Sequence, residues 1–359
     1  MQPRPQRGGR APHIVEFNIV QFGFLHQFIF DVRHVKHFCQ NVTGFFQVNF
    51  PNLFQHLIQV YLVYHPYSNI GVVAAKVIRN EDFNEQEWNI AGIFEQDPPQ
   101  MRPFVIHYIL AKQFEKHTVI LMDYCNISNL FDIIKTNIDL SISTIRVIMK
   151  QLLEGIRYIH SKNLIHRDIK GGNIMLHCQP GSGRVNLKIT DFGVVKVNSG
   201  DEKTMQMTAI GTEPYMAPEF VLGNGEEQVR ADSKVDIWSL GILFFKLASH
   251  RFPCGQLNIQ SIITFMNKYS QTKVLDRPQN IKNDLLWDLL VKMLQFDRKD
   301  RISAQIALQH PFFTGEQAMR EIASEQIQLS QTAEQAKQKG DQNISQFETN
   351  PSFIFPLTE

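Results

Sequence analysis

The sequence predicts an α+β protein with a small β-rich lobe followed by a larger, mainly α-helical lobe. Short runs of β-branched and apolar residues occur up to residue 125, which indicates strands. Beyond that point, longer segments place apolar residues at helical spacing. With 359 residues the chain exceeds the usual size of one domain, so two lobes with flanking segments suit its length.

Composition and charge exclude several classes of protein. Hydrophobic residues make up 43% of the chain, as in globular proteins. The formal net charge is +1, so no general field favours nucleic acid or a membrane surface as a partner. The four cysteines show neither metal-ligand spacing nor a pairing pattern, which favours a reducing, cytoplasmic location. Residues 14–30 are apolar-rich, but polar side chains interrupt them, so we expect no membrane span.

The β-rich lobe is expected to contain strands at 60–64, 71–78 and 118–125. Turn-forming residues separate the first two strands. A segment at 84–94 spaces its apolar residues as a short helix does, and the following prolines end it because proline cannot continue a helix.

Helical patterns occur after the third strand, at 143–160, 235–247, 285–294 and 302–308. The first keeps its apolar residues on one face, so it should bury a stripe. The second is apolar nearly all round, which is typical of a helix at the centre of a lobe.

Chemically suggestive residues are concentrated between residues 164 and 193. Asp168 and Asn173 lie five residues apart, and a strand-like run follows them. A Pro-Gly-Ser-Gly turn joins that run to a second strand at 187–190, so an antiparallel hairpin is expected. The hairpin would bring Asn173 back beside Asp191, and two oxygen ligands would meet where Mg²⁺ bound to phosphates needs them.

These motifs together resemble the set found in eukaryotic-type protein kinases; they are His166-Arg167-Asp168, Asn173 and Asp191-Phe192-Gly193. The resemblance covers roughly residues 60–313. It implies a two-lobed protein kinase-like fold and transfer of the γ-phosphoryl group of ATP to a protein hydroxyl, with Mg²⁺ bound. Lys170 matches the form typical of serine/threonine kinases, so the implied partner is a protein substrate with a Ser or Thr acceptor.

The resemblance assigns roles around the reacting groups. Asp168 is implied to be the catalytic base, Lys170 to neutralise phosphate charge, and Asn173 and Asp191 to hold the metals. Asn173 also counts among the implied catalytic residues.

Lys76 lies in an apolar strand and follows Val-Ala-Ala, which resembles the kinase V-A-x-K motif. Its ammonium needs a partner or water, because unpaired burial is costly. In the family this lysine grips the α- and β-phosphates and pairs with a glutamate of the short helix. Glu87 is the expected partner, with Glu85 as the alternative.

The resemblance also implies a nucleotide pocket. Val60 and Ala74 are expected to line it, with Ala74 against the adenine, and Met122 takes the gatekeeper position behind the base. Backbone groups from Asp123 to Cys125 would hydrogen-bond the edge of the adenine.

Residues 191–219 resemble an activation segment. Thr212 is expected to brace the catalytic aspartate. Thr208 matches a frequent phosphosite for an upstream kinase, and a phosphate there would pair with Arg167 and order the loop. A plain exposed threonine is the alternative.

Further residues are implied to support this arrangement. Asp236 lies inside an apolar helix and needs hydrogen-bond partners. In the family this aspartate accepts backbone N–H bonds from the His-Arg-Asp loop. Arg301 resembles the arginine that pairs with Glu219 and ties the activation segment to its lobe.

The sequence departs from the family at the glycine-rich loop, whose three glycine positions hold Leu53, Gln55 and Ile58. Bulkier residues would lift this loop off the phosphates, because only glycine lets backbone N–H groups approach closely. A pseudokinase or scaffold with weakened nucleotide binding is therefore the alternative to an active kinase. An altered N-terminus is the alternative to a changed loop. A small-molecule kinase is disfavoured by the link between Glu219 and Arg301.

Three regions are expected along the chain. Residues 1–49 form an irregular or disordered extension, and the kinase domain spans 50–313, with its lobes at about 50–124 and 125–313. A polar C-terminal tail follows at 314–359; its first part could form a solvated helix, and its last part, 341–359, is expected to be unstructured. Phe353-Ile354-Phe355 either docks on the small lobe or belongs to a free tail.

Overall fold

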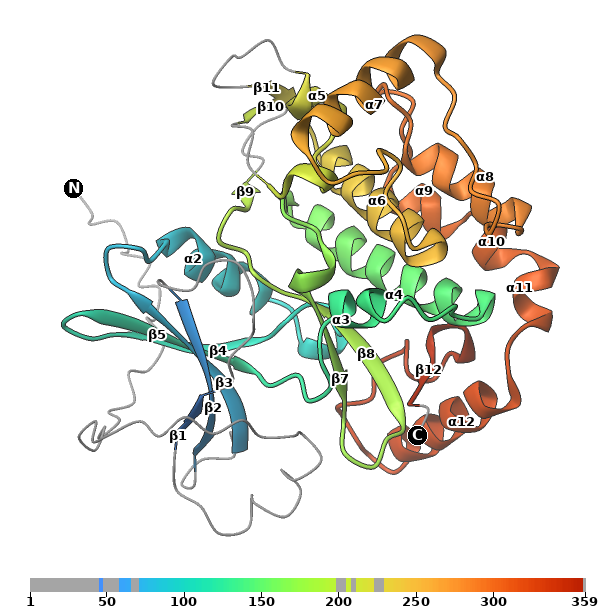
Figure 1. Ribbon diagram of the computed structural model, residues 1–359. Helices are drawn as coiled ribbons and strands as arrows, with labels where there is room; N and C mark the ends of the chain where they lie inside the picture. Colours follow the sequence, from blue (N-terminus) through green and yellow to red (C-terminus); the bar gives the residue numbers. More distant parts are fainter. Residues whose placement is uncertain are drawn as a thin grey trace, which may run out of the picture. The chain divides into compact units, whose positions relative to one another are not determined.

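The chain divides into two units. The computed structural model describes residues 45–47, 58–65, 71–197, 205–207, 211–222 and 229–357. The small unit comprises Met1–Phe83 and Ile109–Met122, and the large unit comprises Asn84–Tyr108 and Asp123–Glu359. The described part of the small unit is mainly a β-sheet, and the large unit is mainly helical (Figure 1). The predicted α+β class is confirmed.

A five-stranded sheet in the order β1-β2-β3-β5-β4 forms most of the described part of the small unit. Its strands are β1 (Phe45–Gln47), β2 (Ile58–His65), β3 (Gly71–Arg79), β4 (Tyr108–Gln113) and β5 (His117–Asp123). β2 and β3 are antiparallel, from Ile58 opposite Ile78 to His65 opposite Gly71. Val73, Ala75 and Leu121 pack into a core on one face, as the alternation of side chains along a strand requires. The three predicted strands are thus confirmed, and β1 lies within the extension that we expected to be irregular.

The large unit contains the remaining elements. In chain order they are α2 (Glu85–Phe94), η2 (Pro99–Met101), α3 (Leu130–Lys135), α4 (Ile142–Ser161), β6 (Leu164–Ile165), η3 (Gly171–Asn173), β7 (Ile174–Cys178), β8 (Arg184–Ile189), β9 (Lys196–Val197), β10 (Met205–Met207), η4 (Glu213–Tyr215), α5 (Pro218–Val221), β11 (Val229–Ala231), α6 (Lys234–Ser249), α7 (Ile259–Thr272), α8 (Asp284–Met293), α9 (Ala304–Leu308), α10 (Pro311–Thr314), α11 (Glu316–Arg320), α12 (Ser324–Gln338), η5 (Pro351–Phe353) and β12 (Phe355–Pro356).

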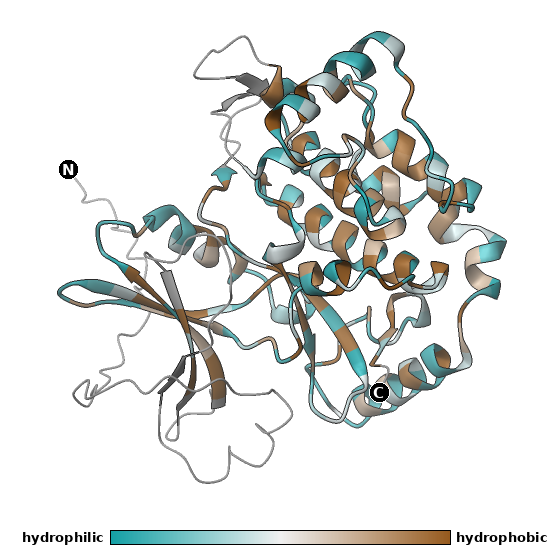
Figure 2. Ribbon diagram, in the orientation of Figure 1, coloured by the Kyte–Doolittle hydropathy of each residue, from teal (hydrophilic) through white to brown (hydrophobic). Residues whose placement is uncertain are grey.

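Two central helices organise the large unit. Ser141 caps the start of α4, since its hydroxyl accepts a hydrogen bond from the Thr144 amide and so satisfies one of the free N–H groups of the first turn. α6 is hydrophobic along most of its length, as Figure 2 shows, and Trp238 and Leu243 within it are fully buried. α6 ends at His250, which adopts a left-handed conformation (φ 60°) and donates its N–H to Lys246 O. The helices predicted at 143–160 and 235–247 are therefore confirmed.

The C-terminal region differs from the expectation of an unstructured end at 341–359. Residues 341–357 are ordered into turns, η5 and β12, and β12 pairs with β8 in a three-stranded sheet of order β12-β8-β7. Phe353 packs with Phe104 and Phe347 on the large unit rather than on the small lobe. The physical reason is that the edge of β8 offers a backbone partner to β12 and the ring of Phe104 offers an aromatic partner to Phe353, and a sequence pattern reveals neither partner.

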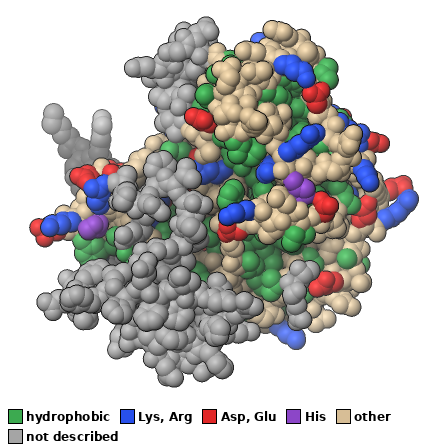
Figure 3. Space-filling view, in the orientation of Figure 1, with side chains coloured by type: hydrophobic (Ala, Val, Ile, Leu, Met, Phe, Trp, Pro, Cys, Tyr) green, Lys and Arg blue, Asp and Glu red, His purple; other side chains and the backbone are tan. Residues whose placement is uncertain are grey.

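The surface agrees with the near-zero net charge. On the face shown in Figure 3, the basic and acidic side chains of the described residues are mixed rather than gathered into one large patch. Within the described part of the chain, no helix is long and apolar enough to cross a membrane. The predicted apolar-rich segment at 14–30 lies outside the described residues.

Candidate active site

The predicted hairpin is confirmed by the pairing of β7 and β8. Ile174 lies opposite Ile189, and the strands run antiparallel to Cys178 opposite Val185. Thr190 donates its N–H to Asn173 O (3.0 Å), so the residues that flank the hairpin meet at one end of it. Asp191 follows directly, with a left-handed backbone (φ 69°) that is uncommon for a non-glycine residue and typical of functional sites.

Asp168 lies at the centre of a hydrogen-bonded cluster. Thr212 donates its hydroxyl to Asp168 Oδ1 (2.9 Å), and Lys170 Nζ lies 2.7 Å from Oδ2. Lys170 also donates to the Thr212 hydroxyl (2.9 Å), and Asn173 Nδ2 donates to Asp168 Oδ2 (3.0 Å). Both carboxylate oxygens are thus oriented by donors, and the side chain remains 14% exposed. Such a carboxylate is fixed in direction and still accessible to a substrate.

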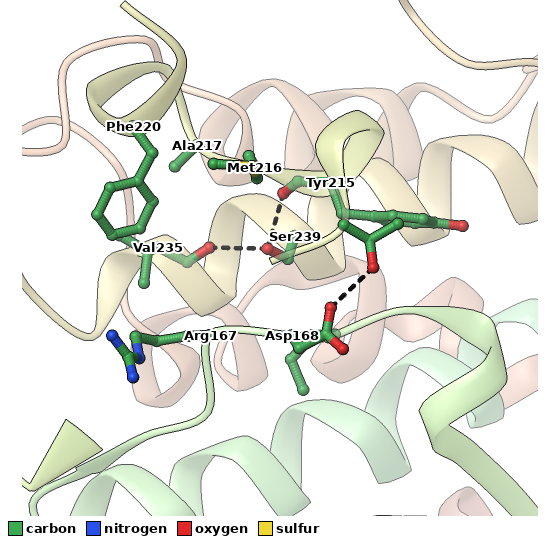
Figure 4. Close-up of a pocket in the computed structure, with 10 residues that line it drawn as sticks. Arg167, Asp168, Tyr215, Met216, Ala217, Phe220, Val235 and Ser239 are labelled. Carbon is green, nitrogen blue, oxygen red and sulfur yellow. Dashed lines mark hydrogen bonds between the residues drawn. The ribbon is translucent and has the colours of Figure 1, made fainter. Parts of the chain in front are cut away.

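A small pocket adjoins this carboxylate, as Figure 4 shows. It lies between the loop that carries Asp168, the segment from Thr212 to Phe220, and the start of α6; the lining residues are Arg167, Asp168, Ile169, Thr212, Tyr215, Met216, Ala217, Phe220, Val235 and Ser239. Ser239 donates its hydroxyl to Tyr215 O (2.8 Å), which holds η4 against α6. In Figure 4 the Asp168 carboxylate points toward the segment that carries Tyr215, and the Arg167 guanidinium points away from it. Burial raises the pKa of the Tyr215 hydroxyl to about 12, so this hydroxyl stays neutral.

Asp236 binds the backbone of the loop that carries Asp168. Its carboxylate accepts the backbone N–H groups of His166 (2.9 Å) and Arg167 (2.8 Å), and His160 Nε2 lies 2.8 Å from it. Burial alone would raise the pKa of this fully buried carboxyl group, but the His160 hydrogen bond and the nearby histidines outweigh that effect and lower it. Asp236 therefore stays ionised and holds the backbone that precedes Asp168.

Arg167 shapes the same loop through its backbone and its side chain. Its φ is 67°, and its Nε donates to Val194 O (2.6 Å) at the start of the predicted activation segment. Gly211 lies against its carbonyl, because a Cβ added to Gly211 would come within 2.8 Å of Arg167 O. Thr208, the predicted phosphosite, lies outside the described residues.

Arg301 and Glu219 form a bidentate ion pair. Arg301 Nη1 donates to Glu219 Oε1 (3.1 Å) and Nη2 to Oε2 (3.0 Å). The same guanidinium also donates to the carbonyls of Lys234, Gln295 and Phe296, and it lies over the Trp238 ring. The arginine side chain is fully buried, so each of its donors has a partner, as burial of a charge requires.

Glu87 is buried in α2, and the hydroxyl of Tyr108 donates to it (3.0 Å). Burial, followed by the nearby Glu87 and Asp191 carboxylates, raises the pKa of Tyr108 well above its usual value. The predicted ion pair between Lys76 and Glu87 would join the two units, and it stays a prediction. Glu85, the alternative partner, is exposed in the first turn of the same helix.

The small unit carries its own set of predicted nucleotide contacts. Val60 lies opposite Lys76 in the β2–β3 ladder, and Ala74 lies two residues before Lys76 on the same face of β3. Lys76 and Ala74 are buried, as is Met122 near the end of β5. Their roles toward a nucleotide stay predictions.

Asp123 is the last residue of β5, and Cys125 follows it by two residues. Asp123 donates its N–H to His107 O (2.9 Å), and its carboxylate lies 3.5 Å from both His107 Nδ1 and Lys188 Nζ. Burial raises the pKa of the Cys125 thiol to about 12, so this cysteine is a poor nucleophile at neutral pH.

We expect the Asp123 carboxylate to stabilise the fold in a pH-dependent way. Burial would raise its pKa, but the His107 hydrogen bond and the Lys188 charge lower it to about 2. A depressed pKa contributes stability above the unfolded value, near 4, and loses it as the pH falls toward 2. Asp123→Asn should therefore cost about 1–2 kcal/mol at pH 7 after allowance for solvent screening, and about half of that at pH 3.

Urea unfolding of wild type and Asp123→Asn at the two pH values measures this difference. Asp276→Asn is the control, because Asp276 is exposed and pairs only with Lys268 at the surface. A penalty for Asp123→Asn that stays constant from pH 7 to pH 3 would contradict the assignment.

Gly171 sets the distance between α3 and the loop that carries Asp168. A Cβ at Gly171 would meet Phe131 N at 2.9 Å and Phe131 Cα at 3.0 Å, whereas a Cβ at Gly172 would meet nothing within 4 Å. Gly171→Ala should therefore displace the loop and lower kcat about 10- to 100-fold, because small misplacements of reacting groups are costly. Gly172→Ala is the matched control and should stay within about twofold of wild type. Equal kcat values for the two variants in steady-state assays would refute the prediction.

The residues present fit a divalent metal held together with phosphates. Asn173 and Asp191 supply one amide and one carboxylate at the same end of the hairpin. Among the described residues, no group of three or more His, Cys, Asp or Glu side chains forms a metal cage. Mg²⁺ usually takes one or two protein oxygens and completes its shell with phosphates and water, so this donor set suits it.

Three supporting residues had not been singled out from the sequence. His160 faces Asp236, Tyr108 faces Glu87, and Ser239 holds the backbone of Tyr215. A weak signal existed for Ser239, which follows Asp236 by three residues and so shares its helix face. His160 and Tyr108 are joined to their partners only by the folding of the chain.

The fold and the geometry around Asp168 together define a protein kinase-like protein. A family model described as Protein kinase domain matches residues 58–313, which is more than half of the chain. The chain therefore belongs to the protein kinase family.

Relatives of known name agree with this family. Serine/threonine-protein kinase 10 of Danio rerio is 33% identical over 261 residues, which cover 71% of this chain and 26% of the relative. The serine/threonine-protein kinase dst4 of Dictyostelium discoideum is 32% identical over 230 residues, covering 63% of this chain and 45% of the relative. The serine/threonine-protein kinase dst2 of the same organism is 36% identical over 198 residues, which cover 54% of this chain and 16% of the relative. This chain thus spans less than half the length of each of these relatives.

Proposed function

We propose that this chain is a protein serine/threonine kinase that transfers the γ-phosphoryl group of ATP to a hydroxyl group of a protein substrate. The observation that carries the proposal is the Asp168 cluster, in which Thr212 and Lys170 orient the two carboxylate oxygens. Lys170 supplies a cation beside this carboxylate. In the proposed reaction this cation would neutralise the negative charge that develops on the transferred phosphoryl group. The names of the relatives support the serine/threonine class.

In the proposed reaction, Asp168 orients the acceptor hydroxyl and takes its proton. The acceptor oxygen forms a bond to the γ-phosphorus as the bond to the bridging oxygen breaks and ADP leaves. Asn173 and Asp191 would hold Mg²⁺, which neutralises charge on the phosphates when bound. Lys170 and Lys76 add positive charge from the protein. Proton acceptance of this kind contributes about 10²–10⁴ in rate.

Phosphate incorporation from radiolabelled ATP with Mg²⁺ tests the proposal. Wild type should label a generic protein substrate, and Lys76→Met should lose most of that labelling because the lysine grips the phosphates. Lys116→Met is the control, since Lys116 is an exposed residue of the small unit. If no labelling depends on Lys76, the proposal is wrong, and a scaffold without phosphoryl transfer takes its place.

A scaffold without phosphoryl transfer is the second candidate, and the missing glycines favour it. Leu53, Gln55 and Ile58 occupy the three glycine positions of the family's phosphate loop. Calorimetric titration with ATP and Mg²⁺ separates the two candidates, because a kinase binds the nucleotide at cellular concentrations and a scaffold of this kind binds it weakly.

Regulation and location belong to the same proposal. We infer that an upstream kinase phosphorylates Thr208 and that Arg167 pairs with the added phosphate. Mass spectrometry that finds Thr208 unmodified in fully active protein would remove this step. The cysteine pattern favours a cytoplasmic location, and imaging of a tagged chain tests it.

A further inference from the structure

The last described part of the chain, residues 343–357, contacts β8, α4, α12 and Phe104 within the large unit, and we call it the C-terminal strap. β12 adds a strand to the edge of β8, with Phe355 opposite Val185 (Figure 1). Leu357 donates its N–H to Gly183 O (2.9 Å) beyond the strand. Strand addition of this kind is a common way in which a folded domain holds an extended peptide.

Two buried glutamines hold the backbone of the strap. Gln151 of α4 donates from Nε2 to Phe353 O (2.7 Å), and its Oε1 accepts the Leu187 N–H of β8 (2.9 Å). Gln326 of α12 donates from Nε2 to Ile354 O (2.8 Å). Since a buried amide left without its partner costs about 1–3 kcal/mol, these bonds select one position of the strap.

Aromatic rings anchor the strap on Phe104. Phe353 stacks on Phe104 at 6.0 Å between ring centroids, with 12° between the planes. Phe347 packs edge-on against both rings, at 5.2 Å from Phe104 and 5.0 Å from Phe353. The three rings are buried and form a cluster of their own. Two rings of the strap therefore pack against the ring of Phe104.

The backbone of Phe104 is hydrogen-bonded to the strand that leads to the proposed metal site. Ile189 of β8 donates its N–H to Phe104 O (2.9 Å), and Ile106 donates its N–H to Ile189 O (2.9 Å). Gly155 of α4 touches the same residue, because a Cβ added there would lie 3.1 Å from Phe104 O. Asp191 follows Ile189 by two residues, so Phe104 is coupled to the start of the Asp-Phe-Gly segment through its own hydrogen bond to Ile189 and through that of Ile106, two residues further on.

Phe104 also lies in the segment that connects α2 to β4. α2 carries Glu87, and its last residue, Phe94, packs edge-on against Phe192 at 5.0 Å. A displacement of Phe104 would thus act on α2 and on the Asp-Phe-Gly segment together. Both contacts lie within the large unit.

We propose that the C-terminal strap positions Phe104, and through it α2 and Asp191, for phosphoryl transfer; this inference rests on the proposed function. Phe353 is a positioning residue, since it acts on the reacting groups only through Phe104. Removal of its ring leaves an apolar space beside Phe104 and releases the alignment of Asp191. Small misalignments of reacting groups lower the rate strongly while every residue of the site is still present.

The test compares two full-length variants that lose similar stability. Phe353→Ala removes the ring from the strap, and Leu289→Ala removes a fully buried side chain from α8, which packs on α6 and α10. Each should destabilise the protein by several kcal/mol, as large-to-small substitutions in a core do. At a temperature where both are folded, Phe353→Ala should lower kcat about tenfold, whereas Leu289→Ala should stay within about twofold of wild type. Phe353→Leu should restore part of the rate.

Hydrogen exchange provides the readout that does not depend on activity. In Phe353→Ala, the amides of Ile106 and Ile189 should exchange faster than in Leu289→Ala, because the loss of global stability raises exchange in both variants and only Phe353→Ala also loosens these bonds locally. Equal kcat losses in the two variants, or equal exchange of both amides in the two variants, would overturn the positioning role and leave the strap a stabilising element only. If wild type transfers no phosphate, the proposed function fails, and exchange alone decides whether the strap holds Phe104.

Discussion

Asp168→Asn protein should phosphorylate a protein substrate about 10²–10⁴ times more slowly than wild type. The amide can still accept a hydrogen bond from the Thr212 hydroxyl, which lies 2.9 Å from Asp168 Oδ1. It cannot accept a proton from the substrate, and it no longer neutralises Lys170, whose Nζ lies 2.7 Å from Oδ2. The loss should fall on kcat, because the base acts only in the transition state. Initial rates with radiolabelled ATP measure it.

The control for this experiment is Asp139→Asn. Asp139 is 91% exposed and pairs with His250 at the surface, so its variant should keep the wild-type rate. Thermal unfolding of both variants separates a chemical loss from a folding loss. Transfer by Asp168→Asn at the wild-type rate would show that the proposed mechanism is wrong.

Arg301→Met should lower the free energy of unfolding by about 3–5 kcal/mol, because it leaves a partly buried carboxylate without its partner. Glu219 would lose two hydrogen bonds, of 3.1 and 3.0 Å. The carbonyls of Lys234, Gln295 and Phe296 would lose a donor as well. Urea unfolding monitored by circular dichroism measures the change.

The matched control is Arg320→Met, which removes an exposed arginine paired with Glu316 on α11. Exposed pairs of this kind contribute about 0.5 kcal/mol or less, so the two arginines should differ several-fold. Glu219→Gln combined with Arg301→Met should cost less than the two single changes together, because both break the same pair. Additive losses, or equal losses for the two arginines, would mean that the Glu219 pair has no special part in stability.

Local patterns were sufficient to predict the hairpin that carries Asn173 and Asp191. A strand, a Pro-Gly-Ser-Gly turn and a second strand lie within 20 residues, so short-range chain geometry alone brings the two ends together. The same holds for α4, whose apolar residues follow the helical period over many turns, and for α6, whose segment is apolar nearly all round, as in a helix at the centre of a lobe. Asp236 could also be identified from the sequence, because a charged residue inside an apolar helix needs hydrogen-bond partners.

Contacts between distant segments were not predictable in this way. Phe353 meets Phe104 across 249 residues, and the short aromatic run around it shows no period that indicates a strand or a helix. We expected an unstructured end there, because the composition of 341–359 is polar and the open edge of β8 leaves no mark in the sequence. His160, which faces Asp236 from another helix, was missed for the same reason.

Most helices and strands, the family resemblance and the residue types around Asp168 could be predicted, because those depend on spacing along the chain. The packing of the folded chain was needed to show that Thr212 and Lys170 orient its two oxygens, that Arg301 pairs with Glu219 and that the C-terminal strap packs on Phe104. Each of these contacts joins side chains whose separation depends on how helices and strands pack. Burial makes their partners obligatory, and no local period encodes which partner is met.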